Sequence, residues 1–156
     1  MIVALDVPTA AEARALVEKL GASVSFYKIG LELSTSGEYY TLLDWLVKRG
    51  KRVFCDLKLH DIPETVRRAV ANLRGRGVTF LTVHADRGVM EAAVKEKGGI
   101  GILAVTVLTS TSQADLVERN RRAKFFYQGA GIRGSRHVQS YDQPLASGNR
   151  GRHGAL

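Results

Sequence analysis

The chain has 156 residues, a formal net charge of +8 at pH 7 and a single cysteine, Cys55. This length suits one ordinary domain with a real hydrophobic core. One cysteine excludes an intramolecular disulfide and a zinc site built on paired cysteines, and we expect Cys55 to be a small buried hydrophobe. No apolar run approaches the roughly 20 residues of a membrane-spanning helix, and the strand-like start is unlike a secretory signal. We therefore expect a cytoplasmic protein that does not bind membranes.

The positive charge is concentrated at the C-terminal end of the sequence. Residues 1–120 hold 16 Lys or Arg against 14 Asp or Glu, whereas residues 121–156 hold seven basic residues against Asp142 alone. The first segment is therefore nearly neutral, and the second is a basic segment rich in glycine and arginine. We predict a folded body at 1–120 and a basic, irregular tail at 121–156. Nucleic acid is not expected as a partner, because the tail contains no recognised nucleic-acid-binding motif.

Strand-like and helix-like patterns alternate along the body. Branched apolar stretches predict strands, and amphipathic stretches with capping residues predict helices. In chain order we predict a strand at 1–7, a helix at 9–21, a strand at 23–30, a helix at 37–50, a strand at 52–59, a helix at 63–77, a strand at 78–85, a helix at 88–98 and a strand at 100–110. Such α/β alternation is typical of a parallel sheet, in either a (β/α)8 barrel or a doubly wound open sheet.

Polar and charged side chains that could bind a ligand or take part in catalysis lie at the strand ends, and their distribution favours the barrel. These side chains are Asp6, Lys28, Asp56 with Lys58, His84, and Thr106 with Thr109. Five successive strands that bring such groups to one edge indicate a ring, because an open sheet concentrates its ligand groups near one switch point. With about five strand–helix units, the predicted fold is an incomplete (β/α)8 TIM barrel.

The stretch "VFCDLKLHDIPETV" at residues 53–66 places two aspartates and a lysine within six positions. Alternate residues of a strand share a face, so Asp56 and Lys58 are expected to point together. Lys28 lies inside another predicted strand, where an unpaired ammonium group is strongly disfavoured. We therefore predict that Asp61 joins these three residues in an array of alternating charge. A preorganised array of this kind can stabilise a charged transition state.

Several of these residues also have a plainer structural interpretation. Asp61 could simply cap the helix that follows it. Asp6 could be a polar residue in a loop, and Lys28 and Lys58 could be ion-pair partners that only stabilise the fold. His84 is expected to support the site as a hydrogen-bonded neighbour rather than to act as a base.

The motifs "ALDVP", "YKIG", "DLKLHDIPETV", "TVHA" and "AVTVLTS" occur here in this order. Over about residues 1–118 the chain resembles the orotidine 5'-phosphate decarboxylase family. The resemblance implies a homodimeric (β/α)8 barrel that converts orotidine 5'-phosphate (OMP) to UMP in pyrimidine biosynthesis. It further implies a carboxy-lyase that uses neither a metal nor a cofactor, with a nucleotide monophosphate as its substrate.

The resemblance also implies a role for each matching residue. Lys58 would protonate the carbanion left at C6 of the pyrimidine, and Asp56 would lie beside the departing carboxylate. Lys28 would contact the ribose and order the charges. The other implied substrate contacts are Asp6 at the ribose, Thr109 near the pyrimidine, and Asp61, Ile62 and Thr65, which would reach into the active site of the partner subunit.

Two other functions remain open. The sister enzyme 3-keto-L-gulonate 6-phosphate decarboxylase shares the D-x-K-x-x-D pattern, but it resembles a magnesium enzyme with a carboxylate where this chain has Lys28. A lysine adds positive charge there and cannot ligate a cation. The remaining alternative is a non-enzyme, either an inactive fragment or an interaction module whose tail binds a polyanion.

The sequence departs from the family after about residue 120. The family continues with a T-P-G-I-R turn, a gating loop with a glutamine and a G-R-P segment that binds phosphate. Here "AGIR" at 130–133 and "YDQP" at 141–144 only echo parts of these. We expect that a shifted reading frame or an internal deletion has truncated the family sequence, and that the chain itself has little or no activity on OMP.

Overall fold

The chain divides into two compact units, Met1–Leu108 and Thr109–Leu156. The computed structural model describes residues 1–107 and 111–118, and the structural statements below refer to those ranges. The boundary predicted near residue 120 and the predicted tail beyond it lie outside the described residues.

In the second unit, residues 113–118 form a short helix. The hydroxyl of Ser112 accepts a hydrogen bond from the backbone N–H of Asp115 at 3.2 Å. In return, the Asp115 carboxylate accepts from the Ser112 N–H at 2.9 Å and from its hydroxyl at 2.7 Å. This reciprocal capping satisfies backbone groups that the first turn of a helix leaves unpaired.

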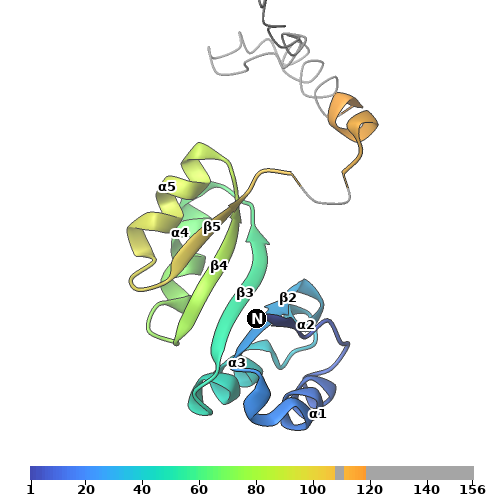
Figure 1. The fold of residues 1–156 in the computed structure, drawn as a ribbon. Helices are drawn as coiled ribbons and strands as arrows, with labels where there is room; N and C mark the ends of the chain where they lie inside the picture. Colours follow the sequence, from blue (N-terminus) through green and yellow to red (C-terminus); the bar gives the residue numbers. More distant parts are fainter. Residues whose placement is uncertain (108–110, 119–156) are drawn as a thin grey trace, which may run out of the picture. The chain divides into compact units, whose positions relative to one another are not determined.

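The first unit contains a five-stranded sheet in which every neighbouring pair of strands is parallel (Figure 1). The strands are β1 (Val3–Ala4), β2 (Phe26–Gly30), β3 (Arg52–Leu59), β4 (Val78–His84) and β5 (Gly101–Val105). Their order in the sheet is β1-β2-β3-β4-β5, which is also their order in the chain. In a doubly wound sheet the spatial order of the strands reverses at a switch point. No such reversal occurs among β1–β5, so the strands follow one another as they do in a barrel.

Helices connect the strands. They are α1 (Ala10–Leu20), α2 (Leu31–Ser34), α3 (Tyr39–Lys48), α4 (Pro63–Leu73) and α5 (Arg87–Glu96), and a single 3-10 turn, η1 (Gly21–Ser23), follows α1. The α/β alternation predicted from the sequence is confirmed. The short elements η1 and α2 were not predicted, and β1 covers only two of the seven residues expected to be extended.

Local sequence signals set the ends of α1 and the start of α4. The Thr9 hydroxyl accepts a hydrogen bond from the Glu12 N–H at 3.2 Å and donates to the Glu12 carboxylate at 3.0 Å. Gly21 follows the last residue of α1 with a φ of +55°. Pro63 is the first residue of α4, where its missing N–H costs nothing. All three predicted signals are confirmed.

Helix α4 ends at Leu73, four residues earlier than predicted. The two glycines that follow, Gly75 and Gly77, have φ angles of +80° and +78°, in the left-handed region. A β-carbon added at Gly77 would lie 2.6 Å from Cγ1 of Val47, whereas one added at Gly75 would meet nothing within 4 Å. Gly77 therefore serves two purposes, a reversal of the backbone and a close approach to α3.

We expect Gly77→Ala to destabilise the fold by about 2–4 kcal/mol, because left-handed strain adds to a steric clash. Gly75→Ala is the matched control, since it should cost only the strain of about 1–2 kcal/mol. Urea denaturation of both variants measures the difference. Equal losses would show that the contact with Val47 relaxes without cost.

The two faces of the sheet differ in character. The side chains that face the helices are fully buried, and they are Tyr27, Ile29, Val53, Cys55, Leu81 and Val83. The opposite face carries aromatic rings toward the start of the strands, where Phe80 lies 5.9 Å from Phe26 and 6.2 Å from Phe54 between ring centroids. Polar side chains follow these rings toward the carboxyl ends of the strands. The polar groups at the carboxyl ends of the strands therefore lie next to a layer of hydrophobic side chains.

The thiol of Cys55 belongs to the buried layer, as predicted. Burial raises its pKa to about 11, despite a hydrogen bond with Tyr39 that acts in the opposite direction. A thiol of this kind stays protonated at neutral pH and is a poor nucleophile.

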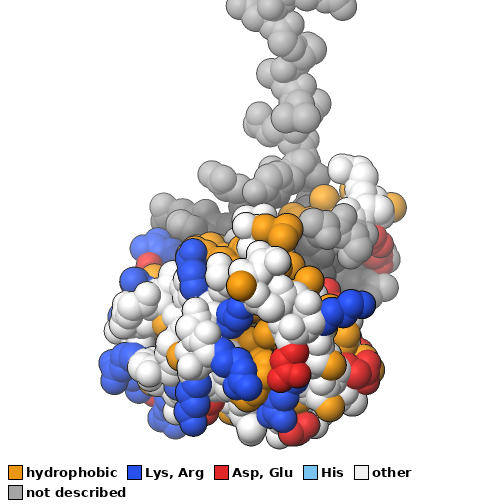
Figure 2. All heavy atoms as spheres, turned by 60° about the horizontal axis from the view of Figure 1, so that its bottom comes forward, with side chains coloured by type: hydrophobic (Ala, Val, Ile, Leu, Met, Phe, Trp, Pro, Cys, Tyr) orange, Lys and Arg blue, Asp and Glu red, His pale blue; other side chains and the backbone are white. Residues whose placement is uncertain are grey.

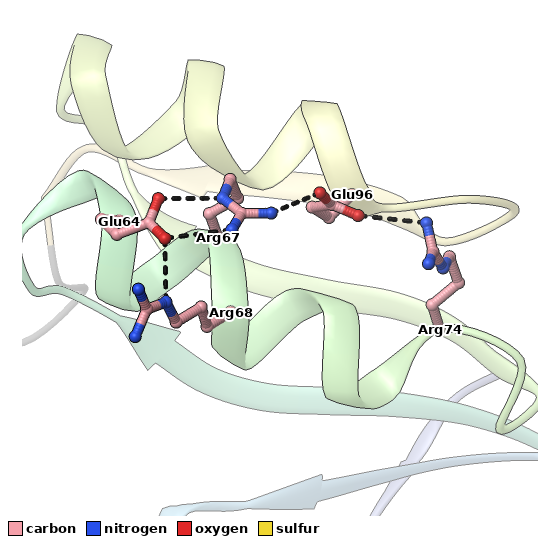
Figure 3. A network of polar contacts seen from close by, with 5 residues as sticks. All are labelled: Glu64, Arg67, Arg68, Arg74 and Glu96. Atoms are coloured by element: carbon pink, nitrogen blue, oxygen red, sulfur yellow. Dashed lines mark hydrogen bonds and ion pairs between the residues drawn. The ribbon is translucent and has the colours of Figure 1, made fainter.

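Helices α4 and α5 lie side by side, and α5 packs against β4 and β5 (Figure 1). Glu96 of α5 accepts hydrogen bonds from Arg67 of α4 and from Arg74, the residue that follows α4. Glu64 binds Arg67 and Arg68 within α4 (Figure 3). Exposed ion pairs each contribute about 0–1 kcal/mol. This network therefore helps to align the two helices but is a minor part of the stability.

The surface seen in Figure 2 carries Lys and Arg side chains that are spread out and interrupted by acidic and uncharged ones. Such an arrangement is that of a solvated surface. Among the described residues, no helix is long and apolar enough to cross a membrane.

Candidate active site

Four charged side chains form a continuous array of alternating sign where β1, β2 and β3 end. Asp6, just after β1, lies 3.1 Å from the Lys28 ammonium, measured from Oδ1 to Nζ. The same Nζ lies 3.6 Å from Oδ2 of Asp56, and Lys58 Nζ lies 2.8 Å from the other oxygen, Oδ1. We call Asp6, Lys28, Asp56 and Lys58 the charge array. The structure brings these four predicted site residues together.

Exposure falls toward the centre of the charge array. The side chain of Asp56 is 14% exposed and that of Lys28 is 23% exposed, against 38% for Lys58 and 62% for Asp6. Burial by itself raises the pKa of Asp56, but hydrogen bonds from Lys58 and Thr82 and the charges of the two lysines outweigh it. The pKa is therefore lowered, and Asp56 is ionised at neutral pH. The stability that its ion pairs provide is lost only as the pH falls through this lowered value.

Thr82 of β4 is a site residue that the sequence analysis missed. Its hydroxyl donates a hydrogen bond to Oδ1 of Asp56 at 2.9 Å and accepts one from the backbone N–H of Lys58 at 2.9 Å. A usable signal was present, because Thr82 precedes His84 by two residues and so shares its face of the strand. Thr82 lies in the "TVHA" motif, but only the histidine was singled out.

The backbone at Lys58 departs from a regular strand. Lys58 has a φ of +47°, and it is the only non-glycine residue with a positive φ in the described part of the chain. Along the ladder, Cys55 pairs with Leu81 but Leu59 pairs with Val83, so β3 contains two extra residues. The regular alternation assumed through Lys58 is therefore wrong in detail, although Lys58 does meet Asp56. A left-handed residue of this type costs about 1–2 kcal/mol.

The predicted contact of Asp61 with the charge array is not seen within the single chain. Asp61 is exposed, and its carboxylate accepts a hydrogen bond from the N–H of Ile62 at 2.6 Å. Ile62 and not Asp61 is the N-cap residue of α4, so the capping interpretation of Asp61 is wrong. Ile62 is 66% exposed and Thr65 is exposed as well. These three residues form an accessible edge at the start of α4.

His84 and Thr109 are the remaining predicted residues of the site. His84 stacks on His60 with ring centroids 4.5 Å apart, next to the end of β4. The Nε2 atom of His60 lies 3.9 Å from a carboxylate oxygen of Asp86. Thr109 lies outside the described residues. Within the described ranges, no group of three or more His, Cys, Asp or Glu side chains has the arrangement to hold a metal ion.

Comparisons with known proteins agree with the resemblance. Residues 1–139 match the family model "Orotidine 5'-phosphate decarboxylase / HUMPS family". The chain is 59% identical over 116 residues to orotidine 5'-phosphate decarboxylase from Methylococcus capsulatus (strain ATCC 33009 / NCIMB 11132 / Bath), covering 74% of this chain and 48% of that protein. It is 53% identical over 124 residues to the enzyme of the same name from Rhodopseudomonas palustris (strain BisB5), covering 78% and 52%.

Solved structures give the same result. Orotidine 5'-phosphate decarboxylase from Lactobacillus acidophilus matches with a TM-score of 0.66 and 34% identity, over 78% of this chain and 58% of that one. The Pyrococcus horikoshii OT3 enzyme matches with a TM-score of 0.63 and 25% identity, over 83% and 62%. The chain spans about half the length of the curated relatives it matches. The predicted incomplete barrel is confirmed, and the chain belongs to the orotidine 5'-phosphate decarboxylase / HUMPS family.

Proposed function

We propose that the charge array carries out the decarboxylation of OMP to UMP, so that the protein is a carboxy-lyase of pyrimidine biosynthesis. The observation that supports this most strongly is the Lys58 ammonium, held 2.8 Å from the half-buried carboxylate of Asp56. An ammonium group in this position can both stabilise negative charge and supply a proton. The name of the family and the identity to the named relatives support the same reaction.

The reaction has two bonding changes. The bond between C6 of the pyrimidine and its carboxyl carbon breaks, carbon dioxide leaves, and the electron pair stays on C6. Lys58 stabilises this developing carbanion and then transfers a proton from Nζ to C6, which forms UMP and leaves a neutral amine that solvent reprotonates. Asp56 orients the Lys58 ammonium beforehand through the ion pair at 2.8 Å.

Lys28 favours this reaction over that of the magnesium-dependent sister enzyme. Its ammonium group lies between the carboxylates of Asp6 and Asp56, at 3.1 and 3.6 Å. A divalent cation shared by those two carboxylates would need the same space. Lys28 therefore supplies the positive charge that a metal would supply, and we propose that the protein needs neither a metal nor a cofactor.

We expect turnover of OMP to be unchanged by excess EDTA or by added magnesium. The measurement is release of labelled carbon dioxide from carboxyl-labelled OMP, a readout that detects slow turnover. Activity that appears only with magnesium, and on 3-keto-L-gulonate 6-phosphate rather than OMP, would favour the sister reaction. A chain that binds neither substrate would favour the non-enzyme alternative.

We further propose a cytoplasmic homodimer in which each chain completes the site of the other. Asp61, Ile62 and Thr65 are exposed at the start of α4, just after the strand that carries Asp56 and Lys58. Their exposure leaves these side chains accessible to a partner chain. The chain that binds substrate through Asp6 and Lys28 would then receive these three side chains from its partner, while Thr109 would contact the pyrimidine.

The charge array alone does not bind the substrate phosphate, so other residues are needed for that. Binding energy from such a remote group normally positions the reacting centre. We therefore expect the chain to turn over OMP far more slowly than its full-length relatives. A rate equal to theirs would mean that residues outside the described ranges bind the phosphate well.

A further inference from the structure

Thr82 has 5% of its surface exposed, and apart from tyrosines it is the only buried side chain with a hydroxyl group in the described part of the chain. A buried hydroxyl is unfavourable unless it is hydrogen-bonded. This one uses its proton and a lone pair at once, as donor to the Asp56 carboxylate and as acceptor from the Lys58 backbone, each at 2.9 Å. One small side chain thus binds both a member of the charge array and the backbone of another.

The position of Thr82 in the ladder explains why its hydroxyl is needed. It lies between Leu81 and Val83, which pair with Cys55 and Leu59 on the neighbouring strand. Between those two pairs β3 contains two extra residues, so the regular ladder of backbone hydrogen bonds is interrupted. The N–H of Lys58 falls in this interruption and finds the threonine hydroxyl instead of a carbonyl group. Thr82 therefore replaces a ladder hydrogen bond where Lys58 has left-handed dihedral angles.

The same hydroxyl fixes the orientation of the Asp56 carboxylate. Oδ1 of Asp56 receives the Thr82 hydroxyl at 2.9 Å and the Lys58 ammonium at 2.8 Å. The other oxygen, Oδ2, is left to face Lys28 at 3.6 Å. Without the hydroxyl, the carboxylate could rotate between its two lysine partners, and the ammonium of Lys58 would lose its fixed place.

We propose that Thr82 is a positioning residue that sets the place of the Lys58 ammonium relative to Asp56. It acts on both ends of this pair, on the lysine through its backbone and on the aspartate through its carboxylate. The effect on turnover rests on the proposed function, whereas the effect on the geometry of the charge array does not. The two parts can therefore be tested separately.

The geometric part is tested by NMR on the full chain without substrate. Thr82→Val keeps the shape and removes the hydroxyl, whereas Thr82→Ser keeps the hydroxyl. In Thr82→Val we expect hydrogen exchange of the Lys58 amide to accelerate about tenfold, as loss of one hydrogen bond implies. The pKa of Asp56 should also rise, because a hydrogen bond to its ionised form has been removed. Thr82→Ser should retain the wild-type value of both.

Three outcomes would overturn the geometric part of the proposal. The first is an unchanged Lys58 amide in a folded Thr82→Val variant, and the second is an unchanged Asp56 pKa. Should Thr82→Val fail to fold, Thr82→Ser decides alone. If its Lys58 amide and its Asp56 pKa both change although the hydroxyl is present, the methyl group rather than the hydroxyl positions the array.

The catalytic part is tested by the kinetics of OMP decarboxylation. Thr82→Val should lower kcat about 10- to 100-fold with little change in KM, as expected for a misplaced proton donor, and Thr82→Ser should restore kcat. An unchanged kcat together with the altered NMR signals would overturn the catalytic role. Altered NMR signals in a chain whose wild type has no turnover would support the positioning and count against the proposed function instead.

Discussion

Replacing Lys58 with alanine is expected to abolish decarboxylation of OMP. The substitution removes the proposed proton donor, and loss of a general acid alone costs about 10²–10⁴-fold in rate. It also removes the ion pair at 2.8 Å, so that Asp56 would oppose the negative charge that develops at C6 with less compensation. These two effects act in the same direction, so we expect turnover to fall below detection.

The measurement is release of labelled carbon dioxide at high protein concentration. The matched control is Lys48→Ala, which removes an exposed lysine at the end of α3, away from the strand ends. A second readout does not need turnover. A UMP analogue with an oxyanion at C6 resembles the carbanion and should bind to the wild type much more tightly than to Lys58→Ala. Equal binding by the two chains, or undiminished turnover in the variant, would contradict the role of Lys58.

Mixing two inactive variants is expected to restore activity. Lys58→Ala lacks the proton donor, and Asp61→Ala lacks the carboxylate that we place in the partner's site. In a mixed dimer, one of the two sites has both native residues. Random exchange makes about half of the dimers mixed, so about a quarter of the wild-type activity should return if sites act independently in a twofold-symmetric dimer.

The subunits can be exchanged by unfolding and refolding the two variants together, with each variant refolded alone as the control. Mixing must be proven, for example with chains of different mass. If activity does not return in proven mixed dimers, Asp61 acts within its own chain or only orders the N–H of Ile62, to which it is hydrogen-bonded at 2.6 Å. Activity in Asp61→Ala by itself would remove Asp61 from the catalytic residues altogether.

Sequence reasoning succeeds where a structural feature has a local cause. Helix α1 has nearly the expected bounds because Thr9 and Gly21 each act within one turn of the helix. The end of α4 was missed because the glycines of residues 75–77 were read as part of the helix, although they have left-handed dihedral angles. Strand β1 was expected to be longer, but only its neighbour β2 defines it, and that pairing is a tertiary property.

The charge array illustrates the same limit within the site. Lys28 could be predicted to need a carboxylate, because burying an unpaired ammonium is costly wherever it occurs. The residues alone placed Asp6 at the same edge of the sheet and added Asp61 to the array. That Asp6 would pair directly with Lys28 depended on the register between β1 and β2. The role of Thr82 was missed for a related reason, although its place on the same strand face as His84 could be predicted. A threonine in a strand is ordinary, and its role here arises from two extra residues in a neighbouring strand.

The buried Cys55 has a consequence for experiments on this protein. It is the only cysteine of the chain, it lies next to Asp56 in sequence, and it is inaccessible in the folded state. A thiol reagent can therefore label the chain only when β3 opens, and the labelling rate reports the free energy of that opening. The unmodified sequence thus contains its own probe of the strand that carries Asp56 and Lys58. Variants at the charge array can therefore be divided into those that loosen this strand and those that leave it closed.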